Sequence, residues 1–305
     1  MEPAESRDLV RRIVDMKKEM NAIILAHNYQ RDDVQDVADF VGDSLELSRK
    51  AASTNSDVII FCGVRFMAET AAIVNPQKTV LLPDISAGCP LADMIDEKKL
   101  DEWKSAHPKA KVVCYVNSSA AVKAMSDVCC TSANATKIVQ QLKGDEILFI
   151  PDENLGRFIS SKTGKRLILY PGFCPTHLRL IPEMILTAKE AYPGAGVMVH
   201  PECTSGVVEL ADVALSTSQM LRYAKESKER AFIVGTEAGI IHRLSLESPS
   251  KSFYLASPLL ICPNMKRITL AKVAECMEKR RYVIEVPEEI RVPAARALEK
   301  MLSVN

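Results

Sequence analysis

Three Cys-Pro steps recur along the chain, at Cys89, Cys174 and Cys262, with the cysteines 85 and 88 residues apart. Thiolates are soft ligands that suit zinc and iron–sulfur clusters. Three thiolates without a fourth favour a cluster with one iron open to substrate, because a cluster used for electron transfer normally has four protein ligands. Zinc bound by the same three cysteines is the competing interpretation, and the ligand chemistry leaves both open.

A second pattern repeats in the same register. An Asp and, five residues after it, a hydroxyl side chain occur in three places: Asp39 with Ser44, Asp127 with Ser132, and Asp212 with Thr217. Because the Asp and the hydroxyl residue recur at the same spacing in three segments, the sequence indicates an internal triplication. The repeat predicts three domains, 1–88 together with 263–305, then 89–173, then 174–262.

Apolar runs flank each repeated Asp, as in NAIILAHNYQ at 21–30 and DVIIFCGV at 57–64. Short β-branched runs that end in polar or turn-forming residues predict buried strands. The helical patterns between them, of roughly 10 to 15 residues, predict crossover helices. Each copy is therefore predicted to be a β-α-β-α-β unit with a parallel sheet, which makes the fold class α/β.

The repeated hydroxyls precede segments with helical patterns. We therefore expect Ser44, Ser132 and Thr217 at or near helix N-termini, where free N–H groups and the positive end of the helix dipole favour anions. Ligands of parallel α/β sheets bind at the carboxyl edge of the strands. Three such edges around one axis predict a central pocket for a small, multiply anionic substrate. The alternative interpretation is that each hydroxyl merely caps its helix.

Composition narrows the class of protein. The 305 residues include 39 basic and 39 acidic side chains, so the net charge of zero argues against binding to nucleic acid or to an anionic membrane surface. No apolar run reaches the roughly 18 residues that would span a bilayer, and the charged N-terminal segment lacks a signal-peptide pattern, so we expect a cytoplasmic protein. Nine cysteines, an odd number, indicate reduced thiols and metal ligation rather than disulfides.

Several longer motifs accompany the three cysteines: AHNYQ at 26–30, GDSLELSRKA at 42–51, FMAETA at 66–71, YVNSSA at 115–120, TSANA at 131–135 and HPEC at 200–203. With them the chain resembles the quinolinate synthase family over nearly its whole length. The resemblance implies three pseudo-symmetric α/β/α domains around a central active site. It also implies a [4Fe–4S] cluster held by Cys89, Cys174 and Cys262, with one open iron that acts as a Lewis acid.

The resemblance further implies a reaction and its partners. Iminoaspartate condenses with dihydroxyacetone phosphate to give quinolinate, phosphate and water, in the biosynthesis of NAD and other pyridine nucleotides. Both substrates are small molecules, and a transient contact with an iminoaspartate-producing enzyme is a further expectation.

Polar pairs two residues apart follow the first strand of each copy, and a carboxylate near an imidazole is a natural acid–base pair. By resemblance, the residues with catalytic roles are His27, Tyr29, His200 and Glu202. The residues implied to bind substrate are His27, Ser44, Tyr115, Asn117, Ser132, His177, His200, Glu202 and Thr217. For a strand-end histidine such as His27, the competing interpretation is a side chain satisfied by a local hydrogen bond.

Two other functions remain open at this point. Another [4Fe–4S]-dependent hydro-lyase, acting on a small anionic substrate, would share the three thiolates and differ in its substrate contacts. A non-catalytic iron or redox sensor would need none of Tyr29, His200 and Glu202, because converging acid–base groups have no purpose in it.

Overall fold

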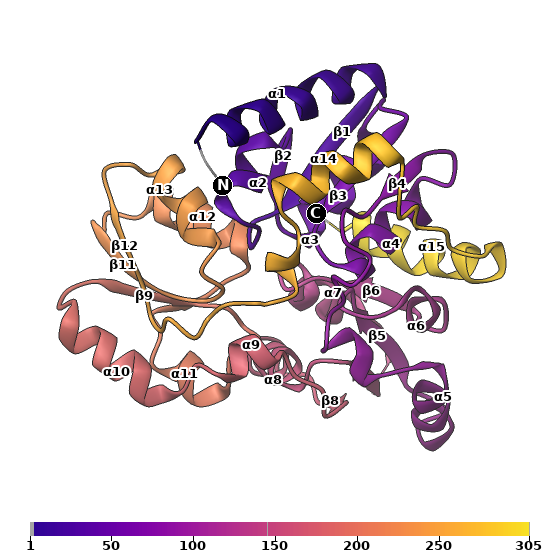
Figure 1. The fold of residues 1–305 in the computed structure, drawn as a ribbon. Coiled ribbons are helices and arrows are strands. Elements are labelled where there is room, and N and C mark those ends of the chain that lie inside the picture. Colours follow the sequence, from indigo (N-terminus) through magenta and orange to yellow (C-terminus); the bar gives the residue numbers. More distant parts are fainter. Residues whose placement is uncertain (1–2, 145, 305) are drawn as a thin grey trace.

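A computed structural model describes residues 3–144 and 146–304 of the chain. Within them the strands form three four-stranded parallel sheets, which lie in three lobes (Figure 1). The strand order is the same in each sheet: the second strand of the copy lies at one edge, followed by the first, the third and the fourth. The α/β fold and the triplication predicted from the sequence are both confirmed, but each sheet has a fourth strand beyond the predicted β-α-β-α-β unit.

The first sheet has the order β2-β1-β3-β4. Its strands are β1 (Ala22–His27), β2 (Phe40–Gly42), β3 (Val58–Cys62) and β4 (Thr79–Leu81). Its helices are α1 (Pro3–Glu19), α2 (Asp32–Val37), α3 (Ser44–Ser53) and α4 (Arg65–Val74). The central strand β3 is buried along its whole length, as expected for a parallel sheet covered by helices on both faces.

The second sheet has the order β6-β5-β7-β8. Its strands are β5 (Lys111–Tyr115), β6 (Val128–Cys130), β7 (Ile147–Ile150) and β8 (Leu167–Leu169). The helices in this part of the chain are α5 (Glu97–Ala106), α6 (Ala120–Ala124), α7 (Ala135–Gln141) and α8 (Glu153–Thr163), preceded by the 3-10 turn Ala92–Met94.

The third sheet has the order β10-β9-β11-β12. Its strands are β9 (Gly196–Val199), β10 (Val213–Ala214), β11 (Ala231–Gly235) and β12 (Ser252–Leu255). The helices here are α9 (Pro175–Leu178), α10 (Pro182–Ala191), α11 (Ser205–Glu209), α12 (Thr217–Glu226) and α13 (Ile240–Glu247), and the 3-10 turn Met265–Arg267 follows.

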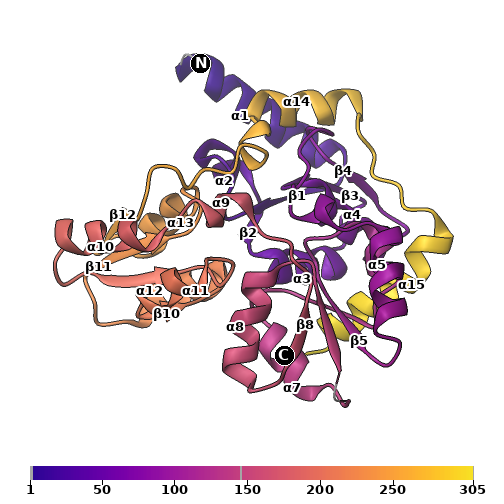
Figure 2. The same ribbon diagram turned by 90° about the horizontal axis from the view of Figure 1, so that it is seen from below.

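The C-terminal helices return to the other two lobes. Helix α14 (Leu270–Lys279) packs on α1, and both views place the two helices together (Figures 1 and 2). Helix α15 (Glu288–Leu302) packs on α6 and β6 of the second lobe and also on α4 of the first.

The domain boundaries drawn from the repeat stay a prediction. Among the described residues, no helix combines the length and the apolar character needed to cross a membrane.

The repeated Asp side chains have a structural role. In each copy the carboxylate accepts the backbone N–H of a residue in the first strand: Asp39 from Ile24 at 2.8 Å, Asp127 from Val112 at 2.9 Å, and Asp212 from Val197 at 2.7 Å. The backbone N–H of each Asp also donates to the carbonyl of the same partner. The Asp therefore fixes where the first strand of each copy begins its pairing.

Replacing Asp127 by alanine should lower the free energy of unfolding by about 1 kcal/mol, because the backbone N–H of Val112 loses its acceptor. Asp127→Asn keeps an oxygen in place and should lose less. Urea unfolding of both variants measures this difference. Equal stability of Asp127→Ala and the parent protein would contradict the structural role.

The strand order also determines where polar side chains gather. In every sheet the chain passes from the first strand to one side and then crosses to the other, so the carboxyl end of β1, β5 or β9 lies at a topological switch point. The three polar pairs of the sequence follow these strands. Each sheet therefore presents one such pair at the edge where α/β proteins bind ligands.

Candidate active site

A cavity of about 190 Å³ is lined by residues from all three copies of the repeat. Every site residue predicted from the sequence lines it: His27, Tyr29, Ser44, Cys89, Tyr115, Asn117, Ser132, Cys174, His177, His200, Glu202, Thr217 and Cys262. The structure thus brings the predicted residues together. The role of each one stays a prediction.

Two histidines of the cavity have the same local geometry. The backbone N–H of Tyr29 donates to Nδ1 of His27 at 3.1 Å, and that of Glu202 donates to Nδ1 of His200 at 3.3 Å. A neutral imidazole that accepts at Nδ1 carries its proton on Nε2. The Nε2 atom of His200 lies 3.2 Å from the hydroxyl of Ser132. The local hydrogen bond is therefore present, as the alternative interpretation expected, and it sets the tautomer that presents Nε2–H.

Both histidines are held in the neutral form. Burial lowers the pKa of His27 to about 3 and that of His200 to about 3, against the partly offsetting charge of Glu202. At neutral pH these rings are therefore hydrogen-bond donors through Nε2–H, and neither is an imidazolium acid.

This neutrality should appear in the pH dependence of stability. Between the ordinary pKa of 6.5 and about 3, the unfolded chain protonates His27 and the folded chain does not, so stability falls as the pH falls. One such group contributes a slope of about 1.4 kcal/mol per pH unit in that window. Urea unfolding of the cluster-free His27→Gln variant should show a slope smaller by about this amount between pH 6 and pH 4. Curves that stay parallel to those of the parent would contradict a neutral His27.

Glu202 is the centre of a buried polar cluster. Its Oε2 atom lies 2.7 Å from Nδ1 of His177 and 3.6 Å from Nδ1 of His200. Its Oε1 atom lies 3.5 Å from Nδ2 of Asn117, and the hydroxyl of Tyr115 donates to the carboxylate. Burial raises the pKa of Glu202, but its interactions with His200, His177 and Tyr115 outweigh burial and hold the pKa below its usual value. The carboxylate is therefore the anion of this cluster.

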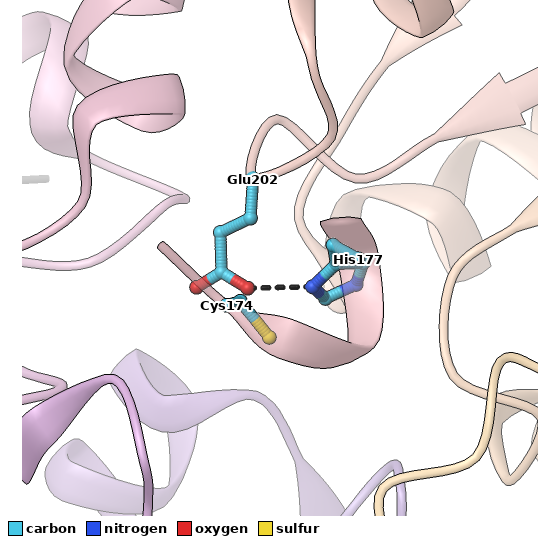
Figure 3. A group of neighbouring side chains, drawn as sticks. All are labelled: Cys174, His177 and Glu202. Atoms are coloured by element: carbon cyan, nitrogen blue, oxygen red, sulfur yellow. Dashed lines mark ion pairs between the residues drawn. The ribbon is translucent and has the colours of Figure 1, made fainter. Parts of the chain in front are cut away.

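A series of polar side chains runs from Tyr29 to this carboxylate. The hydroxyl of Tyr29 is bonded to that of Thr236, which lies 2.8 Å from Nε2 of His177. Figure 3 shows the other ring nitrogen, Nδ1, directed toward Glu202. Thr236 is fully buried, and its place in this site was not predicted from the sequence. The available signal was its position directly after β11, at the carboxyl end of a predicted strand.

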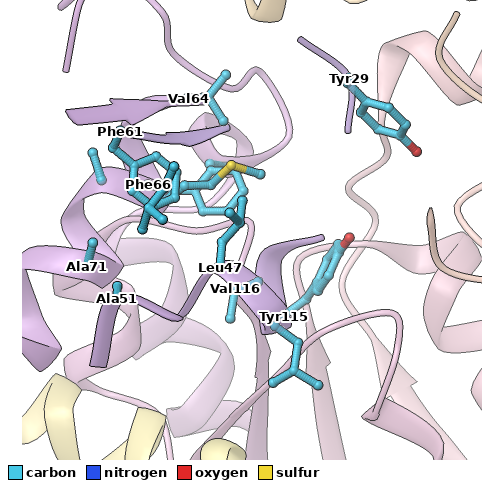
Figure 4. Packing of buried hydrophobic residues seen from close by; sticks show 14 of the residues in the cluster. Tyr29, Leu47, Ala51, Phe61, Val64, Phe66, Ala71, Tyr115 and Val116 are labelled. Atoms are coloured by element: carbon cyan, nitrogen blue, oxygen red, sulfur yellow. The ribbon is translucent and has the colours of Figure 1, made fainter. Parts of the chain in front are cut away.

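Tyr29 and Tyr115 lie where the hydrophobic core meets the cavity. Figure 4 shows Tyr115 beside Val116 and Leu47, with Tyr29 set apart from this packed group and the hydroxyl groups of both tyrosines directed toward the region between the two rings. Burial raises the pKa of each tyrosine well above its usual value, so both hydroxyl groups keep their protons.

The repeated hydroxyls lie near helix N-termini, but other residues are the caps. Asp43 caps α3 and Ser216 caps α12, each one residue before the predicted hydroxyl. Ser44 and Thr217 are thus the first residues of their helices, and the Thr217 hydroxyl accepts a hydrogen bond from Asn28 at 2.8 Å. Because the cap is another side chain, the simple capping interpretation of these two hydroxyls is wrong.

The two helix N-termini also hold the first and third copies together. The hydroxyl of Ser216 donates to Asp43 at 3.1 Å, and the backbone N–H of Asp43 donates to Ser218 at 3.2 Å. Gln219 then reaches the carbonyl of Ala133 in the second copy at 3.3 Å. The three copies therefore meet at this end of the cavity through direct hydrogen bonds.

A buried ion pair supports the other end. Nζ of Lys266 lies 3.0 Å from Glu237 and donates to the carbonyl of Tyr29 at 2.6 Å. The Glu237 carboxylate, 1% exposed, also accepts the backbone N–H of Cys262 at 3.1 Å. This Glu237–Lys266 pair thus joins the Cys262 loop to the Tyr29 loop. Sequence reasoning missed it, because the pair depends on a contact between the third and first copies.

The three repeated cysteines reach the cavity from three separate loops. All nine cysteines of the chain are free thiols, and Cys89, Cys174 and Cys262 line the cavity. Burial raises the pKa of Cys89 to about 12, and Glu202 and Cys262 add to this effect. Three free thiols gathered at one cavity are a donor set that fits a cluster with three thiolate ligands.

Comparison with known proteins places the chain in a family. Residues 11–303 match the family model described as "Quinolinate synthetase A protein". The chain is 55% identical to a quinolinate synthase of Dehalococcoides mccartyi strain CBDB1 over 299 residues, which cover 98% of this chain and 99% of the relative. It is 51% identical to quinolinate synthase 1 of Methanosarcina acetivorans over 301 residues, with 99% of each chain covered.

The chain belongs to the quinolinate synthetase A family. The resemblance noted in the sequence is thereby confirmed. A third relative, the quinolinate synthase of Geobacter sp. strain M21, is 56% identical over 287 residues and covers 94% of both chains. The match to the quinolinate synthetase A family spans all three sheets, so it includes every residue that lines the cavity.

Proposed function

We propose that this protein is a quinolinate synthase, which condenses iminoaspartate with dihydroxyacetone phosphate and releases phosphate and water in NAD biosynthesis. The observation that carries the proposal is the convergence of three free thiols, two neutral histidines and one buried carboxylate on a single cavity in a chain of this family. Its cytoplasmic location and its contact with an iminoaspartate-producing enzyme stay predictions.

Cys89, Cys174 and Cys262 would hold a [4Fe–4S] cluster in this proposal. A bound cluster would supply Lewis-acid chemistry at the iron that lacks a protein ligand. The other steps are assigned to side chains of the cavity.

The series of polar side chains from Tyr29 to Glu202 is suited to proton transfer. Thr236 lies between the Tyr29 hydroxyl and Nε2 of His177, and Nδ1 of His177 faces Glu202. The hydroxyl of Thr236 can donate toward Tyr29 or toward His177, so the hydrogen bonds among these three groups have two arrangements. We assign to this series the proton transfers that ring closure and the following tautomerisations require.

The remaining polar groups would bind the anionic parts of the substrates. Ser44 and Thr217 begin helices α3 and α12, whose N-termini favour phosphate or carboxylate groups. His27 and His200 would donate through Nε2–H without adding charge. Arg179 contributes a guanidinium to the lining of the cavity, which also includes Asp43, Glu202 and Glu237.

An anaerobic assay tests this proposal. Protein with a reconstituted cluster is supplied with dihydroxyacetone phosphate, and iminoaspartate is generated in the same reaction mixture. The quinolinate formed is then measured. The parent should form quinolinate, and Cys89→Ala should form none. Cys276→Ala, which removes a buried thiol of α14 outside the cavity, is the matched control and should keep both iron and activity. A parent that carries a full cluster and forms no quinolinate would favour the hydro-lyase alternative.

A further inference from the structure

Cys174, His177 and Glu202 form a compact group on one side of the cavity. One ligand atom from each lies within 4.8 Å of the other two. Cys174 directly precedes α9, His177 lies in α9, and Glu202 hangs from the loop after β9 (Figure 3). In this view the thiol, the ring nitrogen and the carboxylate oxygen face the same small space.

One atom of this group lacks a hydrogen-bond partner. His177 is 2% exposed, and its Nδ1 atom makes no hydrogen bond, although Glu202 Oε2 lies 2.7 Å away. When Nε2 donates its proton to Thr236, Nδ1 carries a lone pair. Three Lewis bases then face one another, an arrangement that a cation between them would stabilise.

We propose that the cluster-free protein binds one Zn²⁺ ion at Cys174, His177 and Glu202, with water as the fourth ligand. Zinc accepts sulfur, imidazole nitrogen and carboxylate oxygen, and three protein ligands with one water is a common tetrahedral arrangement. The thiol proton of Cys174 leaves to solvent when the metal binds. Thr236 orients His177 from the other side of the ring, as outer-shell partners of zinc ligands do.

Charge favours this site over zinc bound by the three repeated cysteines. One thiolate and one carboxylate carry two negative charges, so the zinc centre is neutral, whereas three thiolates leave a net negative charge in a buried place. The compact group found among residues 3–144 and 146–304 also contains Cys174 without Cys89 or Cys262.

The zinc ion and the [4Fe–4S] cluster cannot bind at the same time, because both need Cys174. This exclusion rests on the proposed function. Zn²⁺ binds nitrogen, oxygen and sulfur sites more tightly than Fe²⁺ does. Zinc bound first should therefore slow the reconstitution of the cluster.

The test separates the two sites with two variants. Cluster-free protein, prepared anaerobically, is titrated with Zn²⁺ against a chromophoric chelator, and cluster loading is followed by iron content and by the electron paramagnetic resonance of the reduced protein. Cys89→Ala should bind zinc as the parent does and fail to hold a cluster. His177→Gln should bind zinc at least about tenfold more weakly and still load a cluster, which also shows that it folds.

X-ray absorption at the zinc edge counts the sulfur ligands, with one sulfur expected at about 2.3 Å. Three sulfurs at the zinc, or zinc binding lost in Cys89→Ala, would overturn this site in favour of the three cysteines. Absence of stoichiometric zinc binding in the parent would overturn it as well. A parent that binds zinc as proposed but forms no quinolinate after cluster loading would remove the proposed function and leave the zinc site standing.

Discussion

Replacing Glu202 by glutamine is expected to lower kcat for quinolinate formation by about 10²- to 10⁴-fold, the range typical of a lost acid–base group. The amide keeps the shape of the side chain, but it cannot take up a proton, which is the role proposed for Glu202. Because Glu202 is not among the proposed cluster ligands, iron content should match that of the parent. Steady-state kinetics on the loaded variant measure the loss.

Glu69→Gln is the matched control for this experiment. Its carboxylate accepts the backbone N–H of Ala120 at 3.1 Å and pairs with Arg65, and Glu69 is not among the residues that line the cavity. Its kcat should stay close to that of the parent. A Glu202→Gln variant within about threefold of the parent would leave Glu202 with a structural role and no part in proton transfer.

Replacing Lys266 by methionine should lower the free energy of unfolding by about 3 kcal/mol, because it leaves Glu237 buried without its cation. Burial already raises the pKa of Glu237 against the opposing effect of Lys266. The cluster should also be lost faster to an iron chelator, since Glu237 holds the backbone of the Cys262 loop. Urea unfolding of the cluster-free protein and the rate of iron release measure the two effects.

The double variant Glu237→Gln/Lys266→Met should recover most of the lost stability, because the buried charge is then gone. Lys272→Met is the control on the same C-terminal segment. It breaks an ion pair with Asp84 in which the lysine side chain is 43% exposed, so we expect a loss of no more than about 1 kcal/mol. Equal losses in Lys266→Met and Lys272→Met would rule out a special role for the Glu237–Lys266 pair.

The features that repeat in the sequence were the ones that could be predicted. The strands, their parallel pairing and the gathering of His27, Tyr115 and His200 follow from apolar runs whose polar ends recur in register. Such patterns are local, and a fold that places every copy alike brings them together without knowledge of any particular contact. The three cysteines at one cavity follow from the same argument.

Features that depend on contacts between copies were not predictable in this way. Thr236 owes its importance to Tyr29, 207 residues away, and Lys266 owes its importance to a carbonyl in the first copy. The repeated Asp was recognised as an anchor, but its bond to a strand N–H 15 residues earlier needed the three-dimensional register of β1 and β2. The pairings of Thr236 and Lys266 with the Tyr29 loop leave no periodic signal, because each occurs once. The Asp bond recurs at the same spacing of 15 residues in all three copies, but the spacing does not show which backbone group the carboxylate binds.

The identical strand order of the three sheets affects how the cavity can distinguish two unlike reactants. Three separate, identical subunits arranged around an axis would offer three equal subsites, and a mutation would change all of them together. Here one polypeptide holds the copies, so each changes alone: the first presents an imidazole and a phenol, the second a phenol and an amide, and the third an imidazole and a carboxylate. Covalent linkage of the copies thus makes the cavity asymmetric, so that two unlike reactants can each meet a different set of polar groups.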